Sequence, residues 1–212
     1  MELAKRYLRR NRGFLAFLLV MLFVRATLAN QYLVPSGSMI PSLQVGDMIL
    51  VDRTAYDLKI PLTQISLVKL SDPQRGDVVV FDSVEDQGTV MVKRLIGVPG
   101  DEIEVINGNV KVNGESIAQV GTVKRDQDEL VQYEERLGEH RYFVQRIPEY
   151  FRPEERVFKV PEGQFLMMGD NRDNSRDGRF FGFVPRNHLI GRAERVLYSW
   201  KFIGDRVGKA LP

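Results

Sequence analysis

The sequence predicts a mainly β protein with an antiparallel core and an inserted subdomain, preceded by one N-terminal transmembrane helix. Short runs rich in Val, Ile and Phe recur after residue 34, and Gly-Asp, Pro-Gly-Asp and Asn-Gly turns separate them. A highly charged, weakly periodic stretch, 115–158, predicts a peripheral and mobile insertion. An apolar N-terminal run follows a cluster of basic residues, which predicts the helix. The expected strands are 48–51, 77–81, 89–96, 103–105, 109–112, 157–160, 164–168 and 191–200.

The N-terminal segment has two readings. Residues 1–12 form a basic tail, and the run 13–34 would be about 33 Å long as a helix, enough to cross a bilayer if Arg25 reaches the headgroups. The basic tail should stay in the cytoplasm, which places the rest of the chain outside. A cleaved signal peptide with a site at Thr27-Leu28-Ala29 fits this segment equally well. We expect a retained anchor because of the motifs described below.

Composition limits the chemistry. The 212 residues include no cysteine, which excludes disulfides, thiolate metal sites and cysteine nucleophiles. The only histidines are His140 and His188, which argues against a multi-histidine metal centre. A net charge of +2 gives no argument for nucleic acid. Hydrolytic chemistry would therefore use Ser, Thr, Lys, Asp, Glu or Tyr.

The first chemical candidate is Ser38, in the segment 35–43 directly after the expected anchor. Pro35, Pro41 and Gly37 surround the serine. Two prolines stiffen such a loop, and a glycine lets a substrate backbone approach closely. A simple Pro/Ser/Gly linker between anchor and domain is the alternative reading.

The second candidate is Lys93, inside an apolar strand pattern. By the two-residue period of a strand it shares a face with Met91 and Leu95. Loss of solvation among apolar neighbours would lower the pKa of a lysine from about 10.4 toward about 8. A neutral amine could then take a proton from a serine. The alternative is a lysine at a strand edge with its ammonium group in water.

A dense polar loop, 169–182, lies between two apolar strand patterns and could orient an active-site amine. Its segment from Asp173 to Gly178 resembles the start of a calcium-binding loop, but Val184 stands where that loop needs a bidentate glutamate. We therefore predict no calcium site. An Asx-rich surface turn remains the alternative.

Taken together, these motifs resemble the bacterial type I signal peptidase family. The resemblance covers the anchor and most of the chain outside about 115–158. The matching blocks, in order, are Pro-Ser-Gly-Ser-Met-Ile-Pro (35–41), Gly-Asp-Met-Ile-Leu-Val (46–51), Arg-Gly-Asp-Val-Val-Val-Phe (75–81), Lys-Arg-Leu-Ile-Gly-Val-Pro-Gly-Asp (93–101) and Gly-Asp-Asn-Arg-Asp-Asn-Ser-Arg-Asp-Gly (169–178).

The resemblance implies a serine endopeptidase with a Ser-Lys dyad. Ser38 would be the nucleophile and Lys93 the general base. The Ser38 backbone N–H and the Ser36 hydroxyl would form the oxyanion hole, and Ser175 would orient Lys93 by a hydrogen bond. No metal or cofactor is implied. The expected reaction removes signal peptides from exported preproteins after small residues at −1 and −3.

The resemblance also implies an organisation and a location. Asp177 and Arg179 match the supporting charged pair of the family. The chain would lie in the bacterial cytoplasmic (inner) membrane as a single-pass protein, with a cytoplasmic N-terminus and the catalytic domain on the outer face. The implied partners are preprotein signal peptides and the lipid bilayer, with the secretion machinery as a further candidate and no nucleic acid.

The expected parts are a catalytic β domain of 35–101 and 159–203, an inserted β subdomain of 102–158 and a C-terminal tail of 204–212.

Two other functions stay open at this point. A Ser-Lys autoprotease of the SOS-repressor type shares the serine and the lysine on a strand, although those proteins are cytosolic. A catalytically inactive, membrane-tethered β module that binds peptides is the second. Intact Ser36, Ser38, Lys93 and Ser175 argue against the second.

Overall fold

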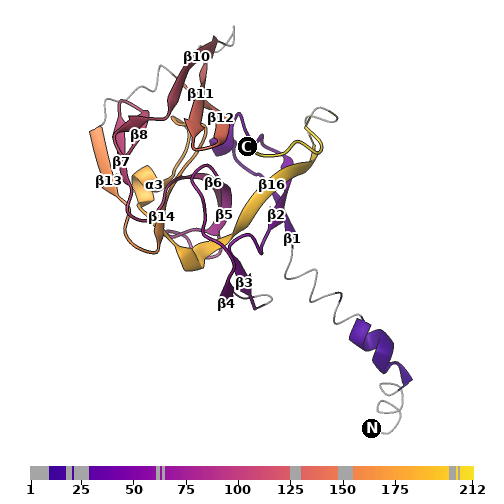
Figure 1. Ribbon diagram of the computed structural model, residues 1–212. Helices are drawn as coiled ribbons and strands as arrows, with labels where there is room; N and C mark the ends of the chain where they lie inside the picture. Colours follow the sequence, from indigo (N-terminus) through magenta and orange to yellow (C-terminus); the bar gives the residue numbers. More distant parts are fainter. Residues whose placement is uncertain are drawn as a thin grey trace.

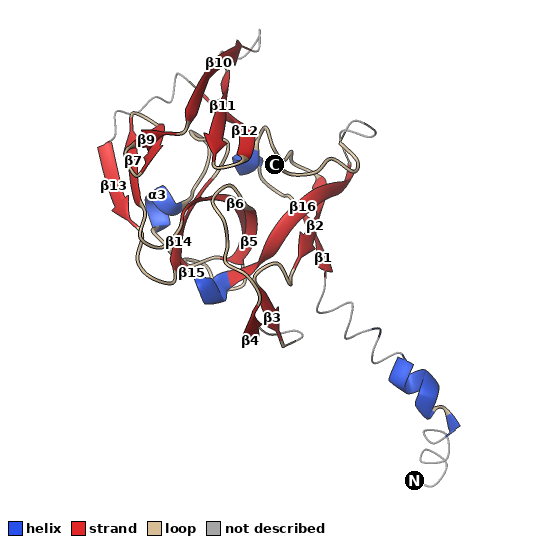
Figure 2. Ribbon diagram, viewed as in Figure 1, coloured by secondary structure: helices blue, strands red, loops and turns tan. Residues whose placement is uncertain are grey.

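The computed structural model of the protein describes residues 10–17, 21, 29–60, 63, 65–124, 130–147, 155–200, 204 and 206–212. The fold is mainly β, as predicted, and each pairing between named strands is antiparallel (Figure 2).

A seven-stranded sheet carries the candidate site, and its strand order is β1-β2-β16-β5-β6-β14-β15 (Figure 1). Its central strands are buried on both faces, so their side chains alternate between two apolar clusters. Val78 and Val80 pack into one cluster, and Val79 and Phe81 pack into the other. The strands are β1 (Ala29–Leu33), β2 (Asp47–Asp52), β5 (Val78–Asp82), β6 (Val90–Gly97), β14 (Gln164–Met168), β15 (Val184–Pro185) and β16 (Leu189–Ser199).

Two smaller sheets lie in the chain between β6 and β14. One has the order β13-β7-β8-β9 and the other β10-β11-β12. Their strands are β7 (Glu102–Ile106), β8 (Asn109–Val112), β9 (Glu115–Ser116), β10 (Ala118–Lys124), β11 (Val131–Leu137), β12 (His140–Arg146) and β13 (Glu155–Lys159).

The expectation of a peripheral insertion over 115–158 is wrong for the described part of this stretch. Tyr142 and Val144 of β12 are buried, and they share a core with Leu166 and Met168 of the large sheet. The alternation of buried side chains was hidden because Glu135 is also buried, although it is charged. Polar residues on an inward face obscure the period-two pattern by which a strand is recognised.

A hairpin that the sequence patterns do not predict stands beside the large sheet. Its strands are β3 (Asp57–Lys59) and β4 (Ser66–Lys69), and all four residues of β4 are exposed. An exposed strand lacks the alternation of apolar and polar residues that identifies a half-buried strand.

The N-terminal expectation needs a correction. Residues 29–33, assigned to the end of a transmembrane helix, instead form β1 and pair with β2 from Ala29↔Asp52 to Leu33↔Met48. Residues 12–17 are helical, while 18–20 and 22–28 lie outside the described residues. Among the residues that are described, no helix has the length and apolar character needed to cross a membrane.

Candidate active site

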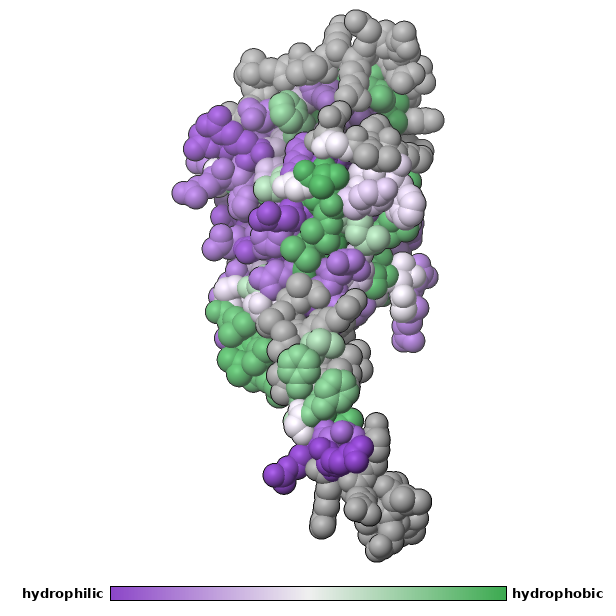
Figure 3. Space-filling model, turned by 90° about the vertical axis from the view of Figure 1, so that its right-hand side faces the viewer, coloured by the Kyte–Doolittle hydropathy of each residue, from purple (hydrophilic) through white to green (hydrophobic). Residues whose placement is uncertain are grey.

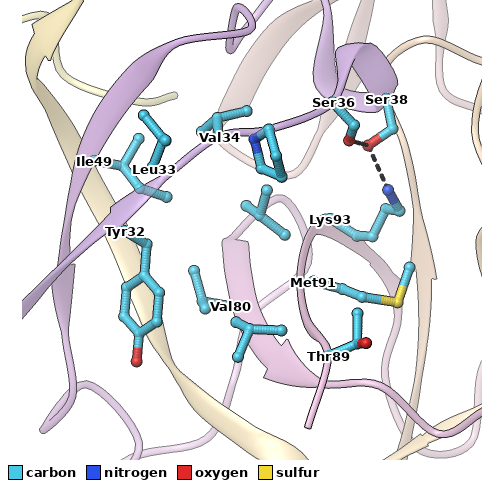
Figure 4. Close-up of a pocket in the computed structure, with 13 residues that line it drawn as sticks. Tyr32, Leu33, Val34, Ser36, Ser38, Ile49, Val80, Thr89, Met91 and Lys93 are labelled. Atoms are coloured by element: carbon cyan, nitrogen blue, oxygen red, sulfur yellow. Dashed lines mark hydrogen bonds between the residues drawn. The ribbon is translucent and has the colours of Figure 1, made fainter. Parts of the chain in front are cut away.

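Ser38 lies in a short turn directly after the first strand. The 3-10 helix η1 (Gly37–Met39) carries it, and Met39 and Leu43 anchor the turn because both are buried. The serine is itself 8% exposed. Its Oγ lies 2.5 Å from Nζ of Lys93 (Figure 4). A linker between anchor and domain would not bury its serine against a lysine, so the linker interpretation is wrong.

Lys93 reaches the serine from β6, opposite Val79 of β5. The lysine is 3% exposed, and Met91 and Leu95 of the same strand pack into one apolar cluster, as the strand period predicts. Burial lowers the pKa of Lys93 from its ordinary value to about 8, although the nearby carboxylates of Asp177 and Asp170 oppose the shift. About a tenth of the amine is then neutral at pH 7. The structure therefore supplies a base close to Ser38.

Ser36 adds a second hydroxyl to the site. Its Oγ lies 3.4 Å from Oγ of Ser38, on the side away from Lys93 in Figure 4. A hydroxyl in this position is able to donate a hydrogen bond to an oxyanion that forms at the carbon attacked by Ser38.

Residues 169–179 of the polar loop 169–182 form the back of the site. Asp177 accepts hydrogen bonds at 2.9 Å from Nε and from Nη2 of Arg179, and at 2.9 Å from the backbone N–H of Gly169. Burial alone would raise the pKa of Asp177, but the paired guanidinium and these donors hold it below its usual range. Asp177 and Arg179 are therefore a buried ion pair behind the lysine, and the reading of this loop as a surface turn is wrong.

Gly169 sets how closely this loop approaches the nucleophile. A side-chain Cβ at this position would overlap with the Ser175 hydroxyl and with the Ser38 carbonyl oxygen. Only glycine allows such a close approach, so the loop and the serine turn are in direct contact at this point.

A cavity of about 250 Å³ opens beside the dyad. Ser36, Ser38 and Lys93 form its polar end, and the remaining lining is mostly apolar (Figure 4). One strand edge without a partner in the described sheet borders it. Within the described sheet, residues 90–93 of β6 pair with β5 alone, since β14 joins β6 only from Arg94 onward. The other lining residues are Tyr32, Leu33, Val34, Pro35, Ile49, Val80, Thr89, Val90, Met91 and Val92.

Comparison with known proteins identifies the family. The model of the family described as signal peptidase, peptidase S26, matches residues 8–198. This chain belongs to the S26 signal peptidase family. Signal peptidase I of Pseudomonas aeruginosa is 35% identical over 204 residues, which cover 90% of this chain and 72% of that protein. Signal peptidase I of Rickettsia typhi is 34% identical over 203 residues, which cover 86% of this chain and 76% of that protein.

A solved signal peptidase I from Enterococcus faecalis is also similar. It is 26% identical with a TM-score of 0.38, and the match covers 58% of this chain and 98% of that one.

Within this family member, Ser175 lies near the dyad, but the described residues show no hydrogen bond from its hydroxyl to Lys93. Its hydroxyl is buried and has no hydrogen-bond partner of normal geometry among the described residues. It lies close enough to Asp177 to contribute to the low pKa of that carboxyl group. The predicted role of Ser175 in orienting Lys93 therefore stays a prediction.

Two further residues of the loop support the peptidase site and were not singled out from the sequence. Asn171 donates from its backbone N–H to the Ser38 carbonyl oxygen and from Nδ2 to the Gly37 carbonyl oxygen, both at 3.0 Å. Asp170 accepts from Nε of Arg94 at 2.9 Å and from Nη2 at 2.8 Å. Both residues lie inside the motif 169–178, but partners so far apart in the chain cannot be paired from one sequence.

The two histidines lie elsewhere in the peptidase. His188, in η3 (Arg186–His188), has Nδ1 at 3.1 Å from the Asp82 carbonyl oxygen, and His140 packs against Gly76. No hydrogen bond within the described part of the chain joins either histidine to Ser38 or Lys93.

Proposed function

We propose that this S26 family member removes N-terminal signal peptides from exported preproteins with Ser38 as nucleophile and Lys93 as general base. The observation that carries the proposal is the 2.5 Å contact between Ser38 Oγ and the buried amine of Lys93. A serine hydroxyl needs an adjacent base to become nucleophilic, and Lys93 lies at the required distance.

The reaction proceeds in two stages. Neutral Lys93 takes the hydroxyl proton as Ser38 Oγ attacks the scissile carbonyl carbon. The tetrahedral intermediate collapses, the peptide C–N bond breaks, and the Lys93 ammonium gives its proton to the leaving amine. Lys93, neutral again, then takes a proton from water as the water oxygen attacks the acyl carbon. The second tetrahedral intermediate collapses, the ester C–O bond breaks, and the Lys93 ammonium returns its proton to Ser38 Oγ. The lysine ends each cycle in the state in which it began.

The oxyanion of each tetrahedral intermediate would accept hydrogen bonds from the Ser38 backbone N–H and the Ser36 hydroxyl. Asn171 supports this assignment because it holds the carbonyl groups of Gly37 and Ser38 and so limits rotation of the turn. Donors that are fixed before the reaction stabilise developing charge most effectively.

The substrate would bind as an extended strand between the segment after β1 and the free edge at 90–93. Backbone hydrogen bonds to strand edges are a common way to bind peptides. In an extended chain the −1 and −3 side chains point to the same side, so both would face the cavity beside the dyad. A mostly apolar space of about 250 Å³ that is shared by two side chains favours small residues at both positions.

The proposed location is the bacterial cytoplasmic membrane, with the segment before β1 as a single-pass anchor and the catalytic part on the outer face. Apolar and aromatic side chains on the body support contact with lipid. Tyr198 and Trp200 are exposed and stack edge to face at 5.4 Å, and Leu33 of β1 is exposed too. In Figure 3 apolar residues form a band between polar ones. Trp and Tyr are enriched at membrane interfaces.

The alternatives are less well supported. The family match favours a signal peptidase over an SOS-type autoprotease. The buried contact between Ser38 and Lys93 favours an active enzyme over an inactive binding module, which would not need a lysine with a lowered pKa.

Incubation of the purified full chain with a preprotein tests the proposal. Wild-type protein should release the signal peptide, with the cut after the small −1 residue, and Ser38→Ala should release none. Equal cleavage by folded Ser38→Ala would contradict the proposed nucleophile, and no cleavage by the wild-type protein would contradict the function.

A further inference from the structure

The inserted three-stranded sheet carries a buried carboxylate that the proposed reaction does not use. Glu135 of β11 is 0% exposed and forms a two-pronged ion pair with Arg172, in which Nη1 donates to Oε1 at 2.6 Å and Nη2 donates to Oε2. Arg172 is also buried. Burying two charges costs free energy, and apolar pairs of similar volume are often at least as stable as buried ion pairs. The pair therefore calls for an explanation other than stability.

Arg172 is held at the centre of the polar loop by its other atoms. Its backbone N–H donates to the Gln145 carbonyl oxygen at 2.9 Å, and its Nε donates to the Gly169 carbonyl oxygen at 3.2 Å. Its own carbonyl oxygen accepts from Nη2 of Arg179 at 2.5 Å. The ion pair with Glu135 thus fixes a residue from which hydrogen bonds run to both ends of the loop.

The neighbour of Arg172 in the chain connects the loop to the nucleophile. Asn171 binds the carbonyl oxygens of Gly37 and Ser38, as described above. A displacement of Arg172 would be transmitted through one peptide unit to Asn171, and from there to the turn that presents Ser38. The same displacement would reach the Asp177–Arg179 pair through the Arg172 carbonyl oxygen.

A second residue of the inserted sheet contacts the same region. The Tyr142 ring of β12 lies under the guanidinium of Arg94, with 3.8 Å between the guanidinium carbon and the ring centroid. Arg94 follows Lys93 in β6 and is paired with Asp170. The inserted sheet therefore contacts both Arg172 of the polar loop and Arg94, the neighbour of Lys93.

We propose that Glu135 is a positioning residue for the Ser38–Lys93 dyad and acts through its ion pair with Arg172. The inference rests on the proposed function of the dyad and gives the inserted sheet a role in it. Glu135 binds Arg172 and lies opposite Tyr142 in the pairing of β11 with β12, and within the described residues no hydrogen bond joins it to Ser38 or Lys93.

The test substitutes Glu135→Gln in the full chain, with Glu134→Gln on the same strand as the matched control. Loss of the Glu135 charge should weaken its bond to Arg172 and let the Arg172 side chain move. A misplacement of about 1 Å at a dyad can lower the rate about 100-fold. We expect kcat on a preprotein to fall about 10- to 100-fold with a smaller change in KM, whereas Glu134→Gln should behave as wild type. Wild-type kcat in folded Glu135→Gln would overturn the proposal.

A titration gives a readout that a purely structural role would not change. Burial has the largest effect on the pKa of Lys93 and lowers it to about 8. The carboxylates of Asp177 and Asp170 raise this pKa, and the guanidinium of Arg179 lowers it. A loosened loop admits water, so the pKa of Lys93 in Glu135→Gln should rise toward its ordinary value. NMR of labelled lysine measures this without turnover, so it tests the inference even if the wild-type protein cleaves no preprotein. An unchanged Lys93 pKa would overturn the proposal.

A paired substitution separates positioning from folding if Glu135→Gln does not fold. Glu135→Leu with Arg172→Met replaces the ion pair with apolar side chains and should fold at least as well. It removes the bond from Arg172 Nε to Gly169, so we expect kcat to stay about 10-fold or more below wild type. Recovery of both thermal stability and kcat would mean that the pair is only structural and would overturn the proposal.

Discussion

At the scale of single residues, the central feature is a buried lysine whose protonated form destabilises the folded protein. The protonated form of Lys93 is disfavoured in the fold because burial lowers its pKa to about 8. The unfolded chain binds this proton up to the ordinary pKa of about 10.4. Stability therefore rises with pH between these two values, and below about pH 8 the cost is present in full.

Lys93→Met should accordingly be inactive and yet more stable than the wild-type protein at pH 6. Methionine fills a similar volume without a charge, and the gain should be at most about 3 kcal/mol, reduced by the lost bond to Ser38. Chemical unfolding at pH 6 and pH 10 measures it, and the difference between the two proteins should shrink at the higher pH. Preprotein cleavage by folded Lys93→Met would show that another group acts as the base.

Ser175→Ala tests the residue whose role is still a prediction. If its hydroxyl orients the Lys93 amine, the effect belongs to the transition state, and kcat should fall by about 100-fold or more with KM little changed. Steady-state kinetics on a preprotein separates the two parameters. A raised KM with wild-type kcat would instead place Ser175 in substrate binding.

At the scale of elements, the pairing of β2 with β16 joins β1 and β2 to the strands β5 and β6, the second of which carries Lys93. β16 shifts register beside Gly191, between Leu189↔Phe81 and Gly191↔Val80. A Cβ on Gly191 would overlap with the backbone of Asp52. The close approach of the two strands therefore depends on glycine at this position.

Gly191→Ala should lower the free energy of unfolding by about 1–3 kcal/mol, because the strands must separate to admit the methyl group. Urea unfolding measures the loss. Gly13→Ala is the control, since among the described residues no atom outside its own helix backbone and chain neighbours lies within 4 Å of a Cβ built there. Equal stability of the Gly191→Ala and Gly13→Ala proteins would mean that β2 and β16 do not approach as closely as described.

The core strands could be predicted from the sequence because their signals are local, whereas the pairing of Ser38 with Lys93 was expected only from the resemblance to a family. The apolar runs of β5 and β6 stand out in the sequence, although Lys93 and Arg94 interrupt the second of them. The support of the dyad could not be predicted, because Asn171, Arg172 and Glu135 act through partners distant in the chain. The burial of the inserted sheet was missed for a similar reason, since its polar inward residues hide the alternation.

At the scale of the whole molecule, the inserted sheets and the large sheet form one structure. The core that contains Ile96 and Leu166 of the large sheet also contains Val110 and Tyr142 of the smaller ones. With a shared core and shared hydrogen bonds, the two parts should unfold together. The N-terminal segment is different, because β1 begins at Ala29 and an anchor would have to end before it.

The mature protein should retain its N-terminus through residue 29. Our reason is that the proposed function places Ser38 near the membrane, where a preprotein cleavage site emerges, and a retained anchor holds it there. Mass spectrometry of the protein purified from membranes measures the N-terminus. A chain that begins at Asn30 would replace the anchor with a cleaved signal peptide.

The dependence of kcat/KM on pH tests the central claim, that Lys93 is the base, most directly. The substrate is a peptide with alanine at −1 and −3, measured from pH 5 to 10 with wild-type protein and with His188→Ala. Lys93 must be neutral to accept the proton, so kcat/KM should rise tenfold per pH unit below an apparent pKa of about 8 and level off above it. Both proteins should give the same curve. A plateau already reached by pH 6.5, near the ordinary pKa of histidine, or a flat profile for His188→Ala, would contradict the assignment of Lys93 as the base.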